Sequence, residues 1–278
     1  MTWWGALIIL IPLLSFAFGV RWVLAASTRD DILTGVVLRV FQFYARLVHR
    51  LRISGREHIP QTKNAGPLIV IANHTAGVDP VLIQSACPFE IRWLMAQDMK
   101  VGWLDKLWDW SRIIFIDRSH VGGAAGIREA SAHVKSGGVI GIFPEGRIER
   151  PARTLFPFLP GVGVLIARTG ARVLPVIVDD IPQVDPAWAS LWTPSSASIR
   201  VMPIIDYASE GGRMAPRKIV DDLHQRFQDW TGWPEGETSP EDEDAFREPV
   251  APRRPRARWR AARYFAAGRR KAARSHRR

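Results

Sequence analysis

The chain has 278 residues, of which 47% are hydrophobic, so it can bury one substantial globular core. Its single cysteine, Cys87, excludes an internal disulfide, and no histidine lies beside a cysteine pair, which excludes zinc-ligand spacing. The formal charge of +11 is concentrated at one end, because residues 245–278 hold 13 Arg and Lys and one Glu. Any partner implied by this basic charge is therefore a partner of the C-terminal tail.

The N-terminal segment, residues 1–26, is predicted to be a membrane-anchoring helix. Residues 3–20 carry no charge, and Trp3, Trp4 and Trp22 flank this run, where interfacial aromatic residues are common. Arginines cluster after the run, which by the positive-inside rule places the body on the cytoplasmic side of the cell membrane. The rival interpretation, a cleaved signal peptide, lacks the expected basic n-region. We therefore expect an uncleaved transmembrane helix or a half-inserted one.

Residues 27–52 are predicted to form an amphipathic helix. Ile32, Val36, Val40, Phe43 and Leu47 recur at three- and four-residue steps, and arginines interleave with this stripe. Two interpretations stay open. The helix packs on the body and exposes a basic face, which we prefer, or it lies at the level of the lipid headgroups.

Residues 53–233 are predicted to form one α/β domain. Short apolar runs predict buried strands at 66–72, 91–95, 113–116, 138–143 and 173–178, and the segments between them predict helices at 80–86, 103–110, 122–135 and 162–169. This alternation indicates a largely parallel or mixed sheet with helices on both faces. Ligands of such sheets bind at the carboxyl ends of the strands.

The C-terminal segment, residues 234–278, is predicted to be disordered. An acidic block from Glu235 to Asp244 is followed by a tail rich in Arg, Ala and Pro, which cannot bury enough apolar surface to order itself. The basic tail suits anionic lipid headgroups, nonspecific nucleic acid or solubility alone, and we expect no specific nucleic acid partner.

The first constellation with catalytic potential is Asn73 to Pro80, directly after a predicted strand. His74 is available there as a general base, and Asp79 can reach back to orient its imidazole. Asp79 also fits the N-cap of the next helix, with Pro80 at the first helical position. Both roles can hold together, and the His-x4-Asp pattern is weak by itself.

Three further segments follow predicted strands. Phe143-Pro144-Glu145-Gly146-Arg147 combines a tight turn with a cation that suits a phosphate group. Ile114 to Arg118 is a strand that ends in a charged pair, and Leu174-Pro175-Val176 is a strand that contains proline. Each segment also fits an ordinary structural role.

In this order and with these spacings, the four segments resemble the glycerophospholipid acyltransferase family. His74 and Asp79 match its His-x4-Asp (HX4D) block, and the other blocks match Phe115, Ile116 and Arg118, then residues 143–146, then Pro175. The resemblance covers roughly residues 50–205. Two positions depart from the family: Arg112 replaces the usual glycine of the second block, and Arg147-Ile148 replaces the usual Thr-Arg pair.

The resemblance implies an O-acyltransferase of phospholipid biosynthesis that acts on a lysophosphatidate-like lipid. His74 and Asp79 would be catalytic, and the acceptor would be bound by Asn73, Phe115, Arg118, Phe143, Pro144, Glu145, Gly146 and Arg147. Acyl-CoA or acyl-carrier protein would donate the acyl group, membrane lipids would be the other partners, and neither a metal nor an organic cofactor is implied.

Three alternatives stay open. The acceptor could be another lysophospholipid, a glycolipid or a lyso-aminolipid, because both departures fall in blocks associated with acceptor binding. The same His and Asp could hydrolyse a lipid ester or thioester. A non-catalytic membrane tether that works through its basic tail would leave the four segments unexplained.

Overall fold

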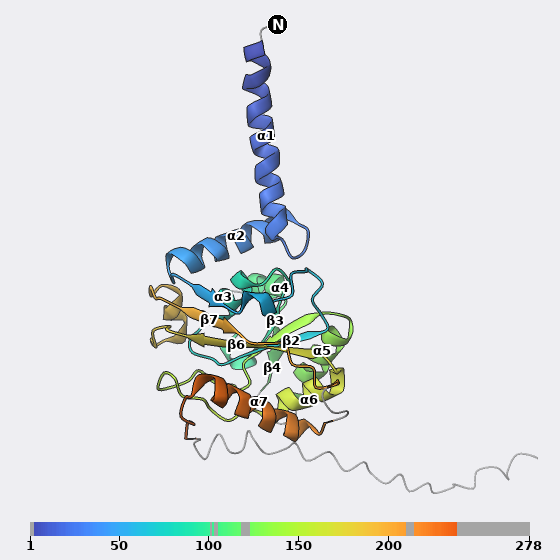
Figure 1. Cartoon of the computed structure of the whole chain (residues 1–278), viewed down its shortest axis with the longest axis vertical. Coiled ribbons are helices and arrows are strands. Elements are labelled where there is room, and N and C mark those ends of the chain that lie inside the picture. The colour runs from blue at the N-terminus through green and yellow to red at the C-terminus, as the bar shows by residue number, and fades with distance from the viewer. Residues whose placement is uncertain (1–2, 101, 103–104, 118–122, 210–213, 238–278) are drawn as a thin grey trace, which may run out of the picture. The chain divides into compact units, whose positions relative to one another are not determined.

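A computed structural model describes residues 3–100, 102, 105–117, 123–209 and 214–237 (Figure 1). Within them, one sheet of seven strands has the order β1-β7-β6-β2-β5-β3-β4. The strands are β1 (Arg52–Ser54), β2 (Leu68–Ala72), β3 (Arg92–Ala96), β4 (Ile114–Ile116), β5 (Val139–Ile142), β6 (Arg172–Asp179) and β7 (Ser198–Val201).

All neighbouring strands run parallel except β6 and β7, which are antiparallel. β2 is central and completely buried, because its five residues, Leu68–Ala72, are all apolar and are covered on both faces. Ile71 lies opposite Ile142 of β5 and Pro175 of β6, so the three strands end at one edge of the sheet. The predicted mixed, largely parallel sheet is confirmed.

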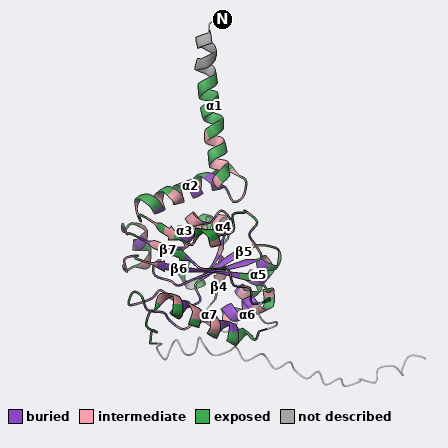
Figure 2. Ribbon diagram, viewed as in Figure 1, coloured by how far each residue is buried: buried purple, intermediate pink, exposed green. Residues whose placement is uncertain are grey.

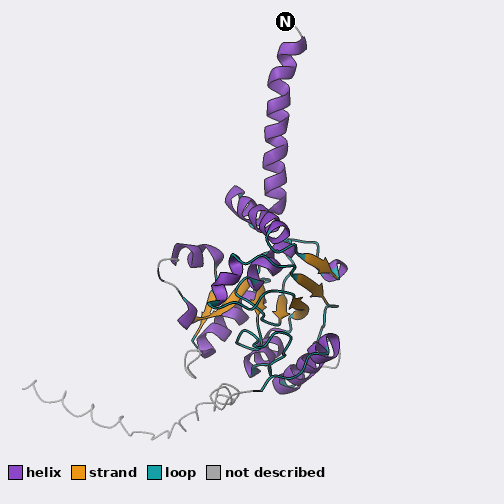
Figure 3. Ribbon diagram, turned by 90° about the vertical axis from the view of Figure 1, so that its left-hand side faces the viewer, coloured by secondary structure: helices purple, strands orange, loops and turns teal. Residues whose placement is uncertain are grey.

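Helices cover both faces of the sheet, as predicted (Figure 3). On one face, Leu68 and Val70 pack with the helices α2 (Ile32–Leu47) and α3 (Asp79–Ala86). On the other face, Ile69 and Ile71 pack with α5 (Gly123–Lys135), α6 (Pro160–Thr169) and α7 (Pro216–Thr231). The alternation of side chains along β2 therefore builds two apolar cores, and the buried strands separate them (Figure 2).

Shorter helices complete the described domain. α4 (Asp105–Ser111) precedes β4, and three 3-10 helices occupy loops: η1 (Arg56–His58), η2 (Gln97–Met99) and η4 (Ala187–Leu191). The predicted helices at 80–86, 103–110, 122–135 and 162–169 correspond to α3, α4, α5 and α6.

The N-terminal region forms α1 (Trp3–Ala26) and, after a short turn, α2. α2 begins later than predicted because the Asp31 carboxylate accepts a hydrogen bond from Thr34 N at 2.8 Å and caps the helix. Arg39 of α2 donates to the Trp22 carbonyl oxygen and lies over the Trp22 ring, so the two helices are held together.

The expected membrane-spanning helix is not found. In the part of α1 and of every other helix that the structure describes, no run is both long and apolar enough to cross a bilayer. The predicted transmembrane span is therefore not confirmed in the described residues, and attachment by a half-inserted helix stays a prediction.

The start of the segment predicted to be disordered is paired with the domain. Leu155 N donates to Pro234 O at 3.0 Å, and Gly236 N donates to Leu155 O at 2.9 Å. The predicted boundary at residue 234 is therefore three or more residues too early, and the remainder of that prediction, residues 238–278, lies outside the described residues.

Candidate active site

The structure brings His74 and Asp79 together at the end of β2. His74 Nδ1 lies 2.8 Å from Asp79 Oδ2, and the loop between the two residues leads directly into α3. The His74 side chain is 16% exposed, whereas the Asp79 side chain is completely buried. One partner of the pair is therefore accessible to a substrate and the other is not.

Asp79 organises the whole loop. Its carboxylate accepts hydrogen bonds from Thr75 N at 2.7 Å, Ala76 N at 2.9 Å and Thr75 Oγ1 at 2.9 Å, in addition to its contact with His74. The N-cap of α3 is Val78, and Asp79 is the first residue of the helix. The predicted capping role of Asp79 is therefore wrong: its side chain stabilises the loop that precedes the helix.

This arrangement defines the chemical state of the histidine. An ionised carboxylate only accepts hydrogen bonds, so His74 Nδ1 carries the proton in the contact with Asp79. His74 Nε2 is then the unprotonated nitrogen and can act as a base. The buried carboxylate also stabilises the imidazolium that forms when Nε2 takes up a proton.

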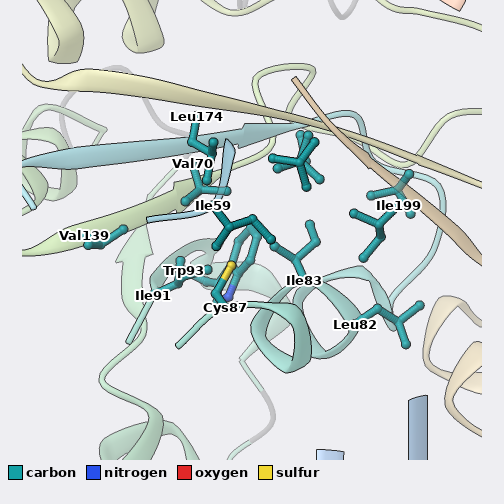
Figure 4. Close-up of a cluster of buried hydrophobic side chains, with 14 of the residues drawn as sticks. Ile59, Val70, Leu82, Ile83, Cys87, Ile91, Trp93, Val139, Leu174 and Ile199 are labelled. Atoms are coloured by element: carbon teal, nitrogen blue, oxygen red, sulfur yellow. The ribbon is translucent and has the colours of Figure 1, made fainter. Parts of the chain in front are cut away.

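Two aromatic rings fix the plane of the imidazole. The Phe143 ring stacks on His74 at 4.0 Å between centroids and 13°, and Trp93 stacks on the other face of Phe143 at 4.9 Å and 13°. Trp93 lies in a buried apolar cluster beside Cys87 and Ile91 (Figure 4). The Phe143 ring therefore supports the histidine, and its predicted part in acceptor binding stays untested.

The loop after β5 holds the backbone of His74 from two sides. Glu145 Oε1 accepts from His74 N at 3.2 Å, while Glu149 N donates to His74 O at 2.7 Å. The other oxygen of Glu145 accepts from Phe156 N at 3.0 Å. Glu145 is buried and both of its oxygens bind backbone amides, so its side chain has a structural role; its predicted part in acceptor binding stays untested.

Two buried carboxyl groups near the pair have altered acidity. Burial raises the pKa of Glu145 to about 8, even though two backbone amides oppose the shift. Burial also raises the pKa of Glu149 to about 7, and nearby carboxylates, including Asp79, add to the shift. One oxygen of Glu149 is buried and has no hydrogen-bond partner. Near neutral pH, Glu145 is therefore mostly protonated and Glu149 is partly so.

Asn73 has a structural role as well. Its side-chain amide donates to Val178 O at 2.9 Å and its side-chain oxygen accepts from Val178 N at 2.8 Å. The side chain is completely buried, so it joins the ends of β2 and β6. These contacts give it a structural role, and its predicted part in acceptor binding stays untested.

The remaining predicted binding residues are spread along the same edge of the sheet. Phe115 lies on β4, three strands from β2, or about 14 Å away at the usual strand spacing. It packs edge-on against Trp108 and is not in contact with His74. Arg118 lies outside the described residues. The second block is therefore at the same edge but apart from the histidine.

The turn after Phe143 has the geometry that its sequence predicts. Pro144 is buried, and Gly146 adopts a positive φ of 66°, which favours glycine. Arg147 follows on the exposed side of the turn, with its guanidinium 4.6 Å from the Phe156 ring centroid. Arg147 was predicted to bind a phosphate group, and its side chain is exposed. Arg112 also has a positive φ, of 54°, which explains why glycine is usual at that position.

Sequence reasoning missed Thr75, Trp93 and Glu149. Arg150 donates to Thr75 O at 3.3 Å and so ties the loop after β5 to the catalytic loop. The spacing of Glu145 and Glu149 was visible in the sequence, but neither the ring stack nor the loop contacts had a sequence signal. In the described chain, no cluster of His, Cys, Asp or Glu has an arrangement that could hold a metal ion.

Comparison with known families decides the assignment. Residues 50–179, which hold β2 to β6 and the whole His74 site, match the family model described as Acyltransferase. This segment belongs to the acyltransferase family. The match leaves α1, α2, β7 and α7 outside.

Solved structures confirm the fold. The acyltransferase domain and its surroundings are similar to the crystal structure of the 1-acyl-sn-glycerophosphate (LPA) acyltransferase PlsC from Thermotoga maritima, with a TM-score of 0.56 and 20% sequence identity. The similarity covers 74% of this chain and 85% of that protein. Among curated proteins, no match was found. The family-model match and the similar fold support the predicted resemblance to the glycerophospholipid acyltransferases.

Proposed function

We propose that this acyltransferase moves a fatty acyl group from an acyl thioester to the hydroxyl of a lysophosphatidate-like lipid. The observation that carries the proposal is the His74–Asp79 contact of 2.8 Å, with a buried carboxylate behind a partly exposed imidazole. This is the arrangement that a general base needs. The acyl donor would be acyl-CoA or acyl-carrier protein.

The reaction proceeds by direct transfer. His74 Nε2 removes the proton from the acceptor hydroxyl, and the oxygen attacks the carbonyl carbon of the thioester. As the tetrahedral intermediate collapses, the carbon–sulfur bond breaks and the imidazolium returns the proton to the leaving thiolate. Cys87 takes no part as a nucleophile, because it is buried and burial raises the pKa of its thiol to about 12.

The lysophosphatidate class of acceptor is supported by two observations. The protein of similar fold is described as a 1-acyl-sn-glycerophosphate acyltransferase. Arg147 also lies at the surface, two residues after the Glu145 that holds the His74 backbone, where a phosphate could reach it.

Exposed apolar surface supports attachment to a membrane. The side chains of α1 from Leu10 to Phe18 include six large hydrophobic residues that are 46–71% exposed, and the outward face of α2 carries six that are 43–76% exposed. Apolar patches of this extent mark interaction sites. We propose that α1 and α2 attach the enzyme to a membrane surface; its position on the cytoplasmic side stays a prediction.

The test uses purified His74→Ala and Asp79→Asn with acyl-CoA and lysophosphatidate. We expect the His74 variant to lose about 10²–10⁴-fold in kcat, because the proton transfer in the transition state is lost. His58→Ala is the matched control, since this histidine is on η1 and 32% exposed, and it should keep wild-type activity. Folded His74 and Asp79 variants with wild-type rates would refute the assignment.

The same assay separates the alternatives. Release of free fatty acid that does not depend on added acceptor would indicate a hydrolase. Transfer to another lysophospholipid, a glycolipid or a lyso-aminolipid, but not to lysophosphatidate, would keep the mechanism and change the acceptor.

A further inference from the structure

Two tryptophans, Trp188 on η4 and Trp192 at its C-cap, are the most exposed aromatic residues outside α1 in the part of the chain that the structure describes. Trp188 is 62% and Trp192 is 74% exposed. Their backbone is nevertheless well fixed, because Ala189 N donates to Pro186 O at 2.8 Å and Trp192 N donates to Ala189 O at 3.0 Å. Ser190 between them is completely buried. The turn therefore holds two large apolar side chains in contact with solvent. Exposure of this apolar area is unfavourable, and packing within the described domain does not bury it.

The η4 turn is continuous with the apolar face of α2. Tyr44 OH donates to Leu191 O at 2.7 Å, and Ser195 N donates to Val48 O at 3.2 Å. Tyr44 also receives a hydrogen bond from buried His49, whose other ring nitrogen is 2.7 Å from Ser195 Oγ. On α2, the neighbours of Tyr44 are Phe43, 51% exposed, and Leu47, 76% exposed.

The same turn touches the catalytic loop. A Cβ atom at Gly77, between His74 and Asp79, would lie 2.8 Å from the carbonyl oxygen of Ala187, so the two backbones are in direct contact. Arg150 bridges the two segments, donating to Thr75 O at 3.3 Å and to Val184 O at 3.4 Å. A partner that binds Trp188 and Trp192 is therefore held close to the loop that contains His74.

We propose that Trp188 and Trp192, together with Phe43 and Leu47 of α2, form a bilayer-contacting surface that places the catalytic loop against the lipid headgroups. We call this the η4 surface. The inference rests on the proposed function, because an acceptor that resides in a membrane gives this surface its use. Tryptophan is the residue that prefers the boundary between headgroups and acyl chains.

Charge supports a lipid partner with anionic headgroups. Arg46 and Arg50 are exposed and flank Leu47 in the sequence. A basic residue near an anionic surface contributes about 1 kcal/mol. Apolar side chains beside arginines suit an interfacial position, with the rings below the headgroups and the guanidinium groups among the phosphates.

A single label on the η4 surface tests the contact directly. Cys87 is the one cysteine in the sequence, and it is buried, so Trp188→Cys and Trp192→Cys can be labelled selectively with an environment-sensitive fluorophore. The control is Asp221→Cys, an exposed position on α7, which covers the opposite face of the sheet. The vesicles are phosphatidylcholine with phosphatidylglycerol, with and without brominated acyl chains.

We expect a blue shift and bromine quenching at positions 188 and 192 and no change at position 221. Protein bound to vesicles with unchanged emission at 188 and 192 would overturn the proposal, and would leave a protein partner as the occupant of the surface. This readout does not depend on acyl transfer, so it remains decisive if the proposed function fails.

An activity comparison separates the surface from a structural role. We expect Trp188→Ala/Trp192→Ala to slow transfer about 10-fold with vesicle-embedded lysophosphatidate, while transfer to a soluble short-chain lysophosphatidate stays at the wild-type rate. Leu107→Ala, another exposed apolar position, is the matched control on α4. Equal losses with both acceptors would contradict the proposal, and absence of transfer by the wild type would refute the proposed function instead.

Discussion

At the scale of the residue, the proposed catalytic histidine, His74, is held in position by several neighbours. Asp79 sets the tautomer of His74, Phe143 sets the plane of its ring, and Glu145 and Glu149 hold its backbone. Two of these neighbours, Phe143 and Glu145, were predicted to bind substrate, and the structure shows them in contact with the histidine. The site is thus built mainly by supporting contacts, as precise placement of a general base requires.

Replacing Phe143 by Leu should lower kcat about 5- to 10-fold with little change in KM. The lost stack is worth about 1 kcal/mol, because the face of the ring favours the imidazolium that forms during transfer. Phe143→Tyr retains the ring and should retain most of the rate. The pH dependence of kcat provides the second readout: a purely structural role would leave the acidic limb of the profile in place.

Replacing Glu149 by Gln should make stability less dependent on pH. Burial raises the folded-state pKa of Glu149 from 4.5 to about 7, so the unfolded chain loses this proton first as pH rises. Glu149 therefore destabilises the fold progressively from about pH 4.5 to about pH 7, by an amount on the order of 1–3 kcal/mol.

Urea unfolding at pH 5 and pH 8 measures this effect. The Gln variant should gain stability relative to the wild type at pH 8 but not at pH 5. Glu57→Gln, at a side chain that is 73% exposed, is the control and should show the same pH dependence as the wild type. If the free energy of unfolding of Glu149→Gln differed from that of the wild type by the same amount at both pH values, the expectation would be contradicted.

At the scale of the element, small residues decide how closely helices approach. Gly163 faces α7, and a Cβ atom there would lie 2.2 Å from the Pro216 carbonyl oxygen. Gly161, two residues earlier on the same helix, has room, since its Cβ atom would meet only Ile127 Cδ1 at 3.5 Å. The two glycines of α6 therefore have different physical roles.

Gly163→Ala should lower the free energy of unfolding by about 1–3 kcal/mol, because α7 must move away from α6. Gly161→Ala should leave stability unchanged or raise it by up to about 1 kcal/mol, because alanine has the higher helix propensity. Chemical denaturation of both variants checks the pair. Similar values for the two would show that the α6–α7 contact does not limit stability.

At the scale of the whole molecule, the described segment 234–237 belongs with the domain and not with the tail. Its pairing with Leu155 lies next to Phe156, whose amide binds Glu145. A truncation should therefore be made after residue 237. Truncation at 234 would remove the contacts of Gly236 with Leu155.

Deletion of residues 238–278 should leave acyl transfer to a soluble short-chain acceptor at the wild-type rate. If the 13 basic residues among 245–278 bind anionic headgroups, the deletion should also weaken binding to phosphatidylglycerol vesicles and remove its salt dependence. Vesicle sedimentation at two salt concentrations measures this. A deletion that abolishes transfer to the soluble acceptor would favour the tether alternative.

Much of the fold could be predicted because the central strands are continuous apolar runs, such as Leu68–Ala72 and Val173–Val178. β1, β7 and α7 were not predicted. β1 and β7 have three and four residues with alternating exposure, a pattern too short to recognise, and α7 is polar over much of its length. The apolar content of α1 was predicted, but its capacity to span a bilayer was not confirmed.

The sequence by itself determined the α/β class, the His74–Asp79 pair and the family, because these depend on residue types at short, fixed spacings. Only the tertiary structure decided what the other site residues do. The side chains of Asn73 and Glu145 are buried, where they accept hydrogen bonds from backbone amides. Asn73 accepts at the end of β6, and Glu145 accepts from the end of β2 and from the loop after β5. The stack of Trp93 on Phe143 joins strands that are 50 residues apart in the chain, and such long-range contacts have no local sequence signal.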